Sequence, residues 1–199
     1  MSLNDKERRL IRLAVAFVQA DYDTLRRLRH EAPDGEPDRA WRETALQAHL
    51  FCGFPRSIAG YTVLKDAGGL GELDDDEVGL NEDPHERGRE LFARIYGKGT
   101  ARVQTELASH HAEFAQWIEG YVYGQVLSRP GLTTRVRELL VIASIAALGH
   151  ERQLAGHVRG SIACGATRAD VDETLELLEG IVSAERLEMA RRVVEHFAR

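Results

Sequence analysis

The sequence predicts an all-α protein. Apolar residues recur at helical spacing in most segments, as in the stripe formed by Leu10, Leu13, Ala14, Phe17 and Val18. β-Branched runs bounded by hairpin turns are missing, so no segment favours a strand. A short internal repeat indicates two similar helical halves. We therefore expect a helical bundle built from two related units.

The composition is that of an ordinary globular domain. The chain has 199 residues, of which 43% are hydrophobic and 29% charged. The net charge of −6 and the lack of a Lys/Arg run argue against a nucleic-acid-binding surface. No apolar run approaches the ~18 residues of a membrane span. The first ten residues lack the apolar core of a secretory signal, so we expect a cytoplasmic protein.

Residues 1–69 are expected to form an N-terminal helical half. Within it, residues 5–32 read as a helix followed by a second short helix after Asp21, and residues 32–37 form a breaker cluster. Residues 70–85 are acidic and rich in glycine, which is typical of a connector. Their carboxylates lack the spacing of a calcium-binding loop, so a solvated acidic loop is expected.

Residues 86–199 are expected to form the C-terminal half, which carries the candidate site. Its helices are predicted to begin near Pro84, before Val103, near His111, after Thr133 or Thr134, at His150, after Thr167 and near Ala184. The helix after Thr134 is apolar on nearly every side, which indicates a central, buried position. Gly149 is expected to end it and to connect it to residues 150–164, running antiparallel.

Four polar residues of these two helices are candidates for a site. Glu138 is a carboxylate near the start of an otherwise apolar helix, and burying it unpaired would be costly. His150, Gln153 and His157 follow at i, i+3 and i+7, which places them on one face of the next helix. If the two helices form an antiparallel hairpin whose packing brings the carboxylate back to this face, Glu138 and the imidazoles can share one cleft. A carboxylate with one or two imidazoles is a plausible acid–base set.

Three pieces of this region carry a family resemblance. They are Arg129-Pro130-Gly131-Leu132 followed by Arg137-Glu138-Leu139, then Ala146-Ala147-Leu148-Gly149 followed by Gln153-Leu154 and His157, then Cys164-Gly165-Ala166-Thr167-Arg168. Together they resemble the core of the carboxymuconolactone decarboxylase family, which also contains the alkylhydroperoxidase-D proteins. The resemblance implies an alkylhydroperoxidase-D-like helical bundle that assembles as a homo-oligomer.

One departure from the family pattern separates its branches. The peroxidase branch has Glu-x11-Cys-x2-Cys-x3-His, and counting from Glu138 places His150 and Gln153 at the cysteine positions and His157 at the histidine position. A dithiol–disulfide cycle needs both thiols. The chain therefore resembles the decarboxylase-like branch, which lacks the CxxC.

The internal repeat distinguishes residues with a structural role from residues of the candidate site. Arg42-Glu43 echoes Arg137-Glu138, and the segment that starts at Gly53 echoes the one that starts at Gly149. In the first copy Phe54, Ser57 and Tyr61 stand where His150, Gln153 and His157 stand in the second. The first copy is therefore interpreted as a degenerate packing partner without a complete site.

The favoured function is a carboxymuconolactone decarboxylase-like enzyme that acts on a small carboxylated lactone or related acid. The resemblance implies acid–base chemistry without a metal or cofactor. Glu138, His157 and His150 are the candidate catalytic residues, and Gln153 and Arg137 the candidate substrate-binding residues. A carboxylate beside an imidazole favours the protonated ring, so His157 is expected to be a general acid whose charge state Glu138 sets.

Two alternatives to this enzyme stay open, and a metal site is not expected. One is a peroxidase-like antioxidant protein that uses Cys52 or Cys164, and the other a catalytically silent oligomeric member. Two cysteines do not make a disulfide framework. The adjacent pair His110-His111 does not face one way on a helix, which makes it a poor metal chelate.

Overall fold

The computed structural model describes residues 3–77 and 83–198, and in these ranges it contains helices and no strand, as predicted. The α-helices are α1 (Asp5–Gln19), α2 (Tyr22–His30), α3 (Asp38–Asp66), α4 (Pro84–Tyr96), α5 (Thr100–His110), α6 (Ala112–Trp117), α7 (Thr134–Leu148), α8 (Glu151–Ala163), α9 (Arg168–Glu176) and α10 (Ala184–Phe197). Short 3-10 helices are η1 (Asp75–Glu77) and η2 (Gly97–Gly99), and η3 (Ile118–Leu127) is a π-helix. Within the described ranges, no helix has the length and apolar character needed to cross a bilayer.

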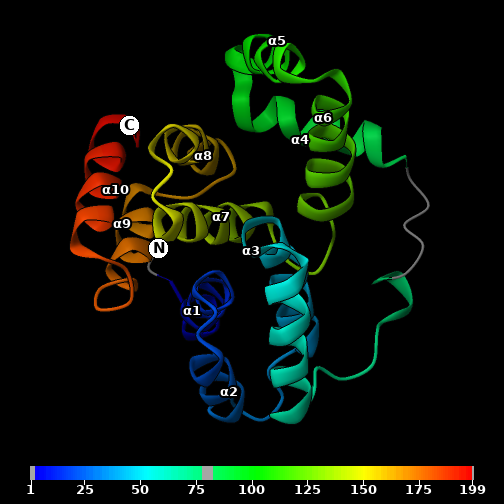
Figure 1. Cartoon of the computed structure of the whole chain (residues 1–199), viewed down its shortest axis with the longest axis vertical. Helices are drawn as coiled ribbons and strands as arrows, with labels where there is room; N and C mark the ends of the chain where they lie inside the picture. Colours follow the sequence, from blue (N-terminus) through cyan, green and yellow to red (C-terminus); the bar gives the residue numbers. More distant parts are fainter. Residues whose placement is uncertain (1–2, 78–82, 199) are drawn as a thin grey trace.

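Helix α7 lies at the centre of the fold, as its sequence predicted. Its residues from Val136 to Ala147 are all buried, and α1, α3, α8, α9 and α10 surround it (Figure 1). Thr133 caps its start by accepting a hydrogen bond from the amide of Val136 at 3.3 Å. Gly149 ends it with a φ of 81°, a left-handed conformation that favours glycine.

A glycine interrupts the helical path in each of the two segments that the sequence suggested as a repeat. Gly149 folds α8 back over α7, so that Glu138 near the start of α7 meets residues near the end of α8. The hairpin is oblique, since α7 lies across the view in Figure 1 while α8 is seen nearly end-on. Helix α3 is also broken at a glycine, Gly53, where φ is 73°. Arg29 connects the start of α3 with the segment just after its end, through hydrogen bonds of 2.6 Å to Asp38 and 2.8 Å to the carbonyl of Gly69.

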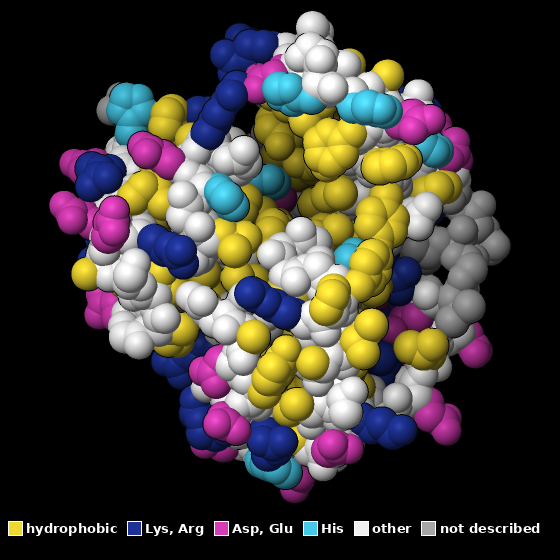
Figure 2. Space-filling model, viewed as in Figure 1, with side chains coloured by type: hydrophobic (Ala, Val, Ile, Leu, Met, Phe, Trp, Pro, Cys, Tyr) yellow, Lys and Arg dark blue, Asp and Glu magenta, His cyan; other side chains and the backbone are white. Residues whose placement is uncertain are grey.

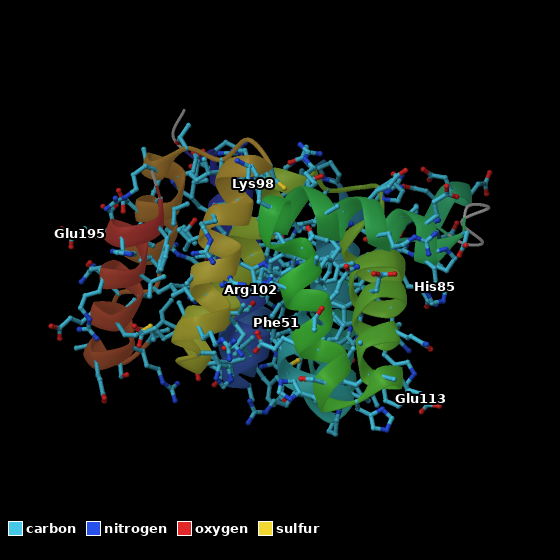
Figure 3. All side chains as sticks on the ribbon, turned by 90° about the horizontal axis from the view of Figure 1, so that it is seen from above. Phe51, His85, Lys98, Arg102, Glu113 and Glu195 are labelled. Atoms are coloured by element: carbon cyan, nitrogen blue, oxygen red, sulfur yellow. The ribbon has the colours of Figure 1, made fainter. Side chains whose placement is uncertain are left out.

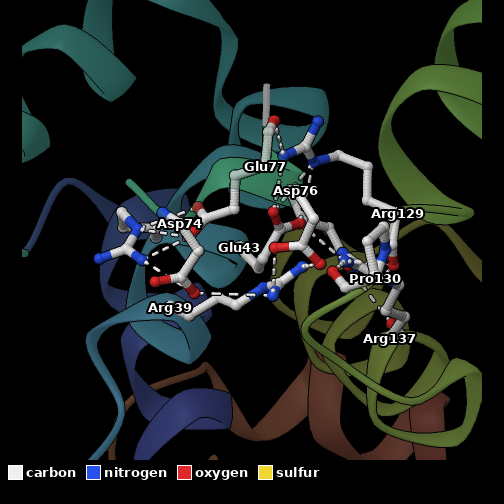
Figure 4. A network of polar contacts seen from close by, with 10 residues as sticks. Arg39, Glu43, Asp74, Asp76, Glu77, Arg129, Pro130 and Arg137 are labelled. Atoms are coloured by element: carbon white, nitrogen blue, oxygen red, sulfur yellow. Dashed lines mark hydrogen bonds and ion pairs between the residues drawn. The ribbon is translucent and has the colours of Figure 1, made fainter. Parts of the chain in front are cut away.

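The connector is not simply a solvated acidic loop, which corrects the expectation for residues 70–85. Glu77 is only 6% exposed and is held by Arg42, while Arg39 binds Asp76 through two bonds of 2.8 and 2.9 Å (Figure 4). Arg129 adds a bond of 3.1 Å to the carbonyl of Glu77. The acidic residues therefore fasten the connector to α3 through arginines. The part of the predicted connector at 78–82 lies outside the described residues.

A buried ion network joins α3 to the start of α7 and the loop before it. Glu43 of α3 is 1% exposed and accepts hydrogen bonds from Arg129 at 2.8 Å and from Arg137 at 2.7 Å (Figure 4). Arg137 also donates to Gln47 at 3.2 Å and to the carbonyls of Arg129 and Pro130 at 2.8 and 3.0 Å. The first turns of α7 are thus fixed to α3.

Helices α4, α5, α6 and η3 form an arm beside α7 and α8. Helix α4 packs against η3 so closely that a Cβ atom on Gly124 would overlap the carbonyl of Pro84. Helices α5 and α6, by contrast, contain no fully buried residue. Figure 1 shows these two helices at one end of the molecule, away from α1 and α2. The arm is therefore firmly packed at α4 and η3, and α5 and α6 project from it.

Candidate active site

The structure brings Glu138 and His157 together. The Nδ1 atom of His157 lies 3.0 Å from Oε2 of Glu138, and the two residues are 8% and 1% exposed. Gly160 makes room for this contact, because a Cβ at that position would press on Ile95 and on the Glu138 carboxylate. Since Nδ1 is bonded to the carboxylate, Nε2 is the ring nitrogen left for a bound molecule.

Two tyrosines complete this cluster, and sequence reasoning did not identify them as site residues. The hydroxyl groups of Tyr96 and Tyr123 are 2.8 Å apart, and the ring centroids of Tyr96 and His157 are 6.3 Å apart. Burial raises the pKa of Tyr96 and raises the pKa of Tyr123 well above its ordinary value. Both phenols therefore stay protonated at neutral pH. Their mutual bond uses one of the two hydroxyl protons, so the pair retains one donor for a ligand.

Local backbone structure positions these tyrosines. Tyr96 is the last residue of α4, after which Gly97 breaks the helix with a φ of 50°. Tyr123 lies inside the π-helix η3, a rare element that is frequent at functional sites. Phe92 packs against both phenol rings, at centroid distances of 4.4 and 4.8 Å. The aromatic packing fixes the two hydroxyl groups relative to His157.

The cluster opens onto a large cavity between α8 and the arm. Its volume is about 1330 Å³, and Tyr96, Tyr123, His150, Gln153 and His157 are among its lining residues. Figure 2 shows the hollow, with histidine side chains on its wall and hydrophobic side chains along one rim. Glu138 contacts His157 but does not line the cavity. Of the two residues, His157 is therefore the one that a ligand in the cavity can contact.

The other predicted site residues divide into two groups. His150 and Gln153 are exposed and line the cavity, although His150 is the residue before α8 rather than part of it. Arg137 does not reach the cavity, which corrects its assignment as a substrate-binding residue. It is 1% exposed, and its guanidinium faces Glu43 and the backbone of the loop before α7. Burial lowers the pKa of Arg137, while the charge of Glu43 acts against that change.

The cavity lining is cationic although the protein is acidic. Its charged residues are Arg94, Lys98, Arg102, Arg152 and Arg159 against Glu106 and Glu151, whereas the whole chain carries a net charge of −6. Arg152 pairs with Glu106 at 2.5 Å, and Arg159 lies 4.6 Å above the ring of Phe197. A cleft lined by one sign of charge concentrates ligands of the opposite sign. The cavity is therefore suited to an anion.

Neither cysteine of the chain is part of the cavity wall. Cys52 and Cys164 are both free thiols. Burial raises the pKa of Cys164 to about 11, so this thiol is protonated at neutral pH. In the described part of the chain, no three His, Cys, Asp or Glu side chains are grouped as metal ligands would be.

Comparison with known proteins places these residues in a family. The model of the carboxymuconolactone decarboxylase family matches residues 112–196, a range that includes Tyr123, Glu138 and His157. A 4-carboxymuconolactone decarboxylase of Acinetobacter baylyi is 31% identical over 96 residues, which cover 48% of this chain and 72% of that protein. Peroxisomal protein 2 of Schizosaccharomyces pombe is 29% identical over 135 residues, 65% of this chain and 62% of that protein. The chain belongs to the carboxymuconolactone decarboxylase family.

Proposed function

We propose that this protein is a carbon–carbon lyase that decarboxylates a carboxylated lactone or a related acid by acid–base chemistry. The observation that carries the proposal is the buried Glu138–His157 pair at the wall of a large cationic cavity. The cations attract a carboxylate substrate, and the imidazole supplies a proton. The relative from Acinetobacter baylyi, named a 4-carboxymuconolactone decarboxylase, supports this class of substrate.

The proposed reaction follows from the demands of decarboxylation. Cleavage of the carbon–carbon bond releases CO₂ and leaves the bonding electron pair on the substrate carbon. That pair must be delocalised, which a conjugated carbonyl allows by taking the charge on its oxygen. The free donor of the Tyr96–Tyr123 pair is placed to stabilise this oxygen. Protonated His157 then gives its Nε2 proton to the carbon, and solvent restores the proton.

The remaining residues have supporting roles in this proposal. Glu138 fixes the orientation of the His157 ring through its contact with Nδ1. His150 lines the same cavity and is a second candidate acid, and Gln153 offers an amide to the substrate. Arg137 is assigned no contact with substrate, because its guanidinium is enclosed by Glu43 and backbone carbonyls.

We also propose that the chain forms a homo-oligomer, as the family resemblance implies. Large hydrophobic side chains are exposed on α3 and α6, among them Phe54 at 65%, Ile58 at 66% and Trp117 at 62%. Apolar side chains of this size at the surface favour burial by a partner. Light scattering coupled to size-exclusion chromatography tests the proposal, and a monomeric mass at micromolar concentration would contradict it.

His157→Gln and Glu138→Gln test the enzyme proposal. The first keeps hydrogen-bonding capacity without titration, and the second keeps shape without charge. Release of CO₂ from carboxylated lactones, 4-carboxymuconolactone first, is measured for each variant beside its thermal unfolding. In the proposed mechanism both variants stay folded and turnover falls by a factor on the order of 10²–10⁴.

A purely structural pair gives a different result. Stability then drops by roughly 1–3 kcal/mol, and activity falls only as the protein unfolds. Folded variants with unchanged turnover would remove His157 and Glu138 from the mechanism. Failure of the wild-type protein to release CO₂ from any carboxylated lactone would refute the proposed reaction.

A further inference from the structure

One face of the arm offers both charge and apolar surface to the cavity. Lys98 of η2 and Arg102 of α5 line it, together with Val103 and Leu107 of α5. Figure 3, which looks down on the molecule, shows Lys98 and Arg102 between α5 and α8. Among the described residues, neither cation has an ion-pair or hydrogen-bond partner. The two cations are therefore available to a ligand.

Two of the other three cations at the cavity already have partners. Arg152 is paired with Glu106 at 2.5 Å, and Arg159 lies over Phe197. Lys98 and Arg102 are four residues apart across the start of α5, a spacing at which two side chains can reach the same group. Ammonium and guanidinium groups that converge on one anion form the charge-assisted hydrogen bonds that proteins use to bind carboxylates.

The cavity is larger than a small lactone requires. Its volume of about 1330 Å³ exceeds the ~300–1000 Å³ that is typical of sites for drug-sized molecules. Much of the wall is apolar, with contributions from Ile95, Phe114, Val122, Leu127 and Ile145. Filling such a wall with an apolar body is favourable by roughly 25 cal/mol for each Å² buried. Size and lining together indicate a ligand with a substantial hydrophobic part.

We propose that the substrate is an amphipathic acid, whose apolar body fills the cavity and whose anionic group binds Lys98 and Arg102. This inference rests on the proposed function for the position of the reacting group, which lies at His157. The anionic group at Lys98 and Arg102 is separate from the carboxylate that is lost. The ligand class itself follows from the cavity alone and can be tested by binding.

The probes are decanoate, decanol and glutarate, titrated into the full-length protein by calorimetry below the micelle concentration of decanoate. Decanoate has both the apolar body and the anion, decanol has the body only, and glutarate has anions without the body. We expect decanoate to bind at least about tenfold more tightly than either of the others, because only it satisfies both surfaces.

The double variant Lys98→Gln with Arg102→Gln is expected to weaken decanoate binding about tenfold and to leave decanol binding unchanged. The matched control is Lys65→Gln with Arg26→Gln, which removes the same charge from exposed positions that do not line the cavity. Decanoate affinity should not change in this control. Equal losses in both double variants would reveal a general charge effect and overturn the assignment.

Three further results would also overturn it: no decanoate binding to the wild-type protein, unchanged binding in the Lys98/Arg102 variant, or glutarate as tight as decanoate. The His157→Gln variant separates this inference from the proposed function, since it should still bind decanoate. Binding that depends on Lys98 and Arg102, without any decarboxylation, would refute the reaction and keep the ligand class. Decarboxylation of small lactones without decanoate binding would refute the ligand class and keep the proposed reaction.

Discussion

The network around Glu43 predicts that Glu43→Gln destabilises the protein strongly. The carboxylate is 1% exposed and accepts hydrogen bonds from Arg129 and Arg137 at 2.8 and 2.7 Å. Glutamine keeps the size of the side chain, but it removes the charge and turns one acceptor into a donor facing guanidinium groups. Arg137, itself 1% exposed, would then be a buried charge without its carboxylate.

The expected loss can be bounded from the contacts that remain. Removing one partner of a buried ion pair costs ~3–5 kcal/mol. Arg137 keeps its bonds to the carbonyls of Arg129 and Pro130 at 2.8 and 3.0 Å, which favours the lower end. We therefore expect a loss of about 3 kcal/mol in the free energy of unfolding. With a urea m value of about 2–3 kcal/mol/M, the midpoint falls by roughly 1–1.5 M.

Urea unfolding followed by circular dichroism at pH 7 measures this loss. Asp172→Asn is the control, because the Arg168–Asp172 pair is about half exposed and should contribute less than ~1 kcal/mol. Adding Arg137→Met to Glu43→Gln should recover part of the stability, since the stranded charge is removed. A loss below ~1 kcal/mol for Glu43→Gln would refute the reasoning.

Three further outcomes are expected. Replacing Cys52 and Cys164 with Ser should leave activity intact, and loss of a hydroperoxide-reducing activity in this variant would instead favour a peroxidase. In the wild-type protein, burial raises the pKa of Cys164 to about 11, so this thiol should react slowly with iodoacetamide at pH 8. Tyr96→Phe should lower kcat by about 10²-fold with little change in thermal unfolding, which stopped-assay kinetics can measure; an unchanged kcat would exclude the oxyanion role. The hydrogen bond from Arg42 lowers the pKa of Glu77 below its ordinary value of 4.5, so the unfolded chain takes up the proton first and stability is lost as the pH falls below about 4.5. Glu77→Gln should flatten that acid limb in urea titrations, and an unchanged limb would show that Glu77 does not contribute.

Local sequence signals were sufficient where one residue determines the backbone. Thr133 and Gly149 bound α7 as predicted, and Thr167 forms a capping box with Asp170 through bonds of 3.1 and 2.8 Å. Each of these features depends on neighbours in sequence, which a single chain displays.

Features that depend on distant contacts were not predicted. Helix α9 ends at Glu176, although apolar residues continue at helical spacing to Val182. The π-helix η3 was expected as ordinary helix, since its extra residue per turn leaves no compositional mark. Arg137 looks like a residue near a site, and only the carboxylate of Glu43, far away in sequence, shows that it points elsewhere. The tyrosine pair likewise joins two segments whose sequences give no sign of the contact.

Two arginines just before the site carboxylate in the sequence, Arg135 and Arg137, limit how far it can move. Glu138 lies in the early part of α7, and the ends of helices ordinarily fray in solution. Here Arg135 forms ion pairs with Glu7 and Asp170 at 2.6 and 2.8 Å, while Arg137 pairs with Glu43 of α3. Arg135 lies three residues before Glu138 and Arg137 directly precedes it, so both sets of ion pairs restrain the helical turn that leads to the carboxylate. The imidazole of His157 therefore meets an acceptor whose place is already set before any substrate arrives, and little of the activation barrier is spent on reorganising it.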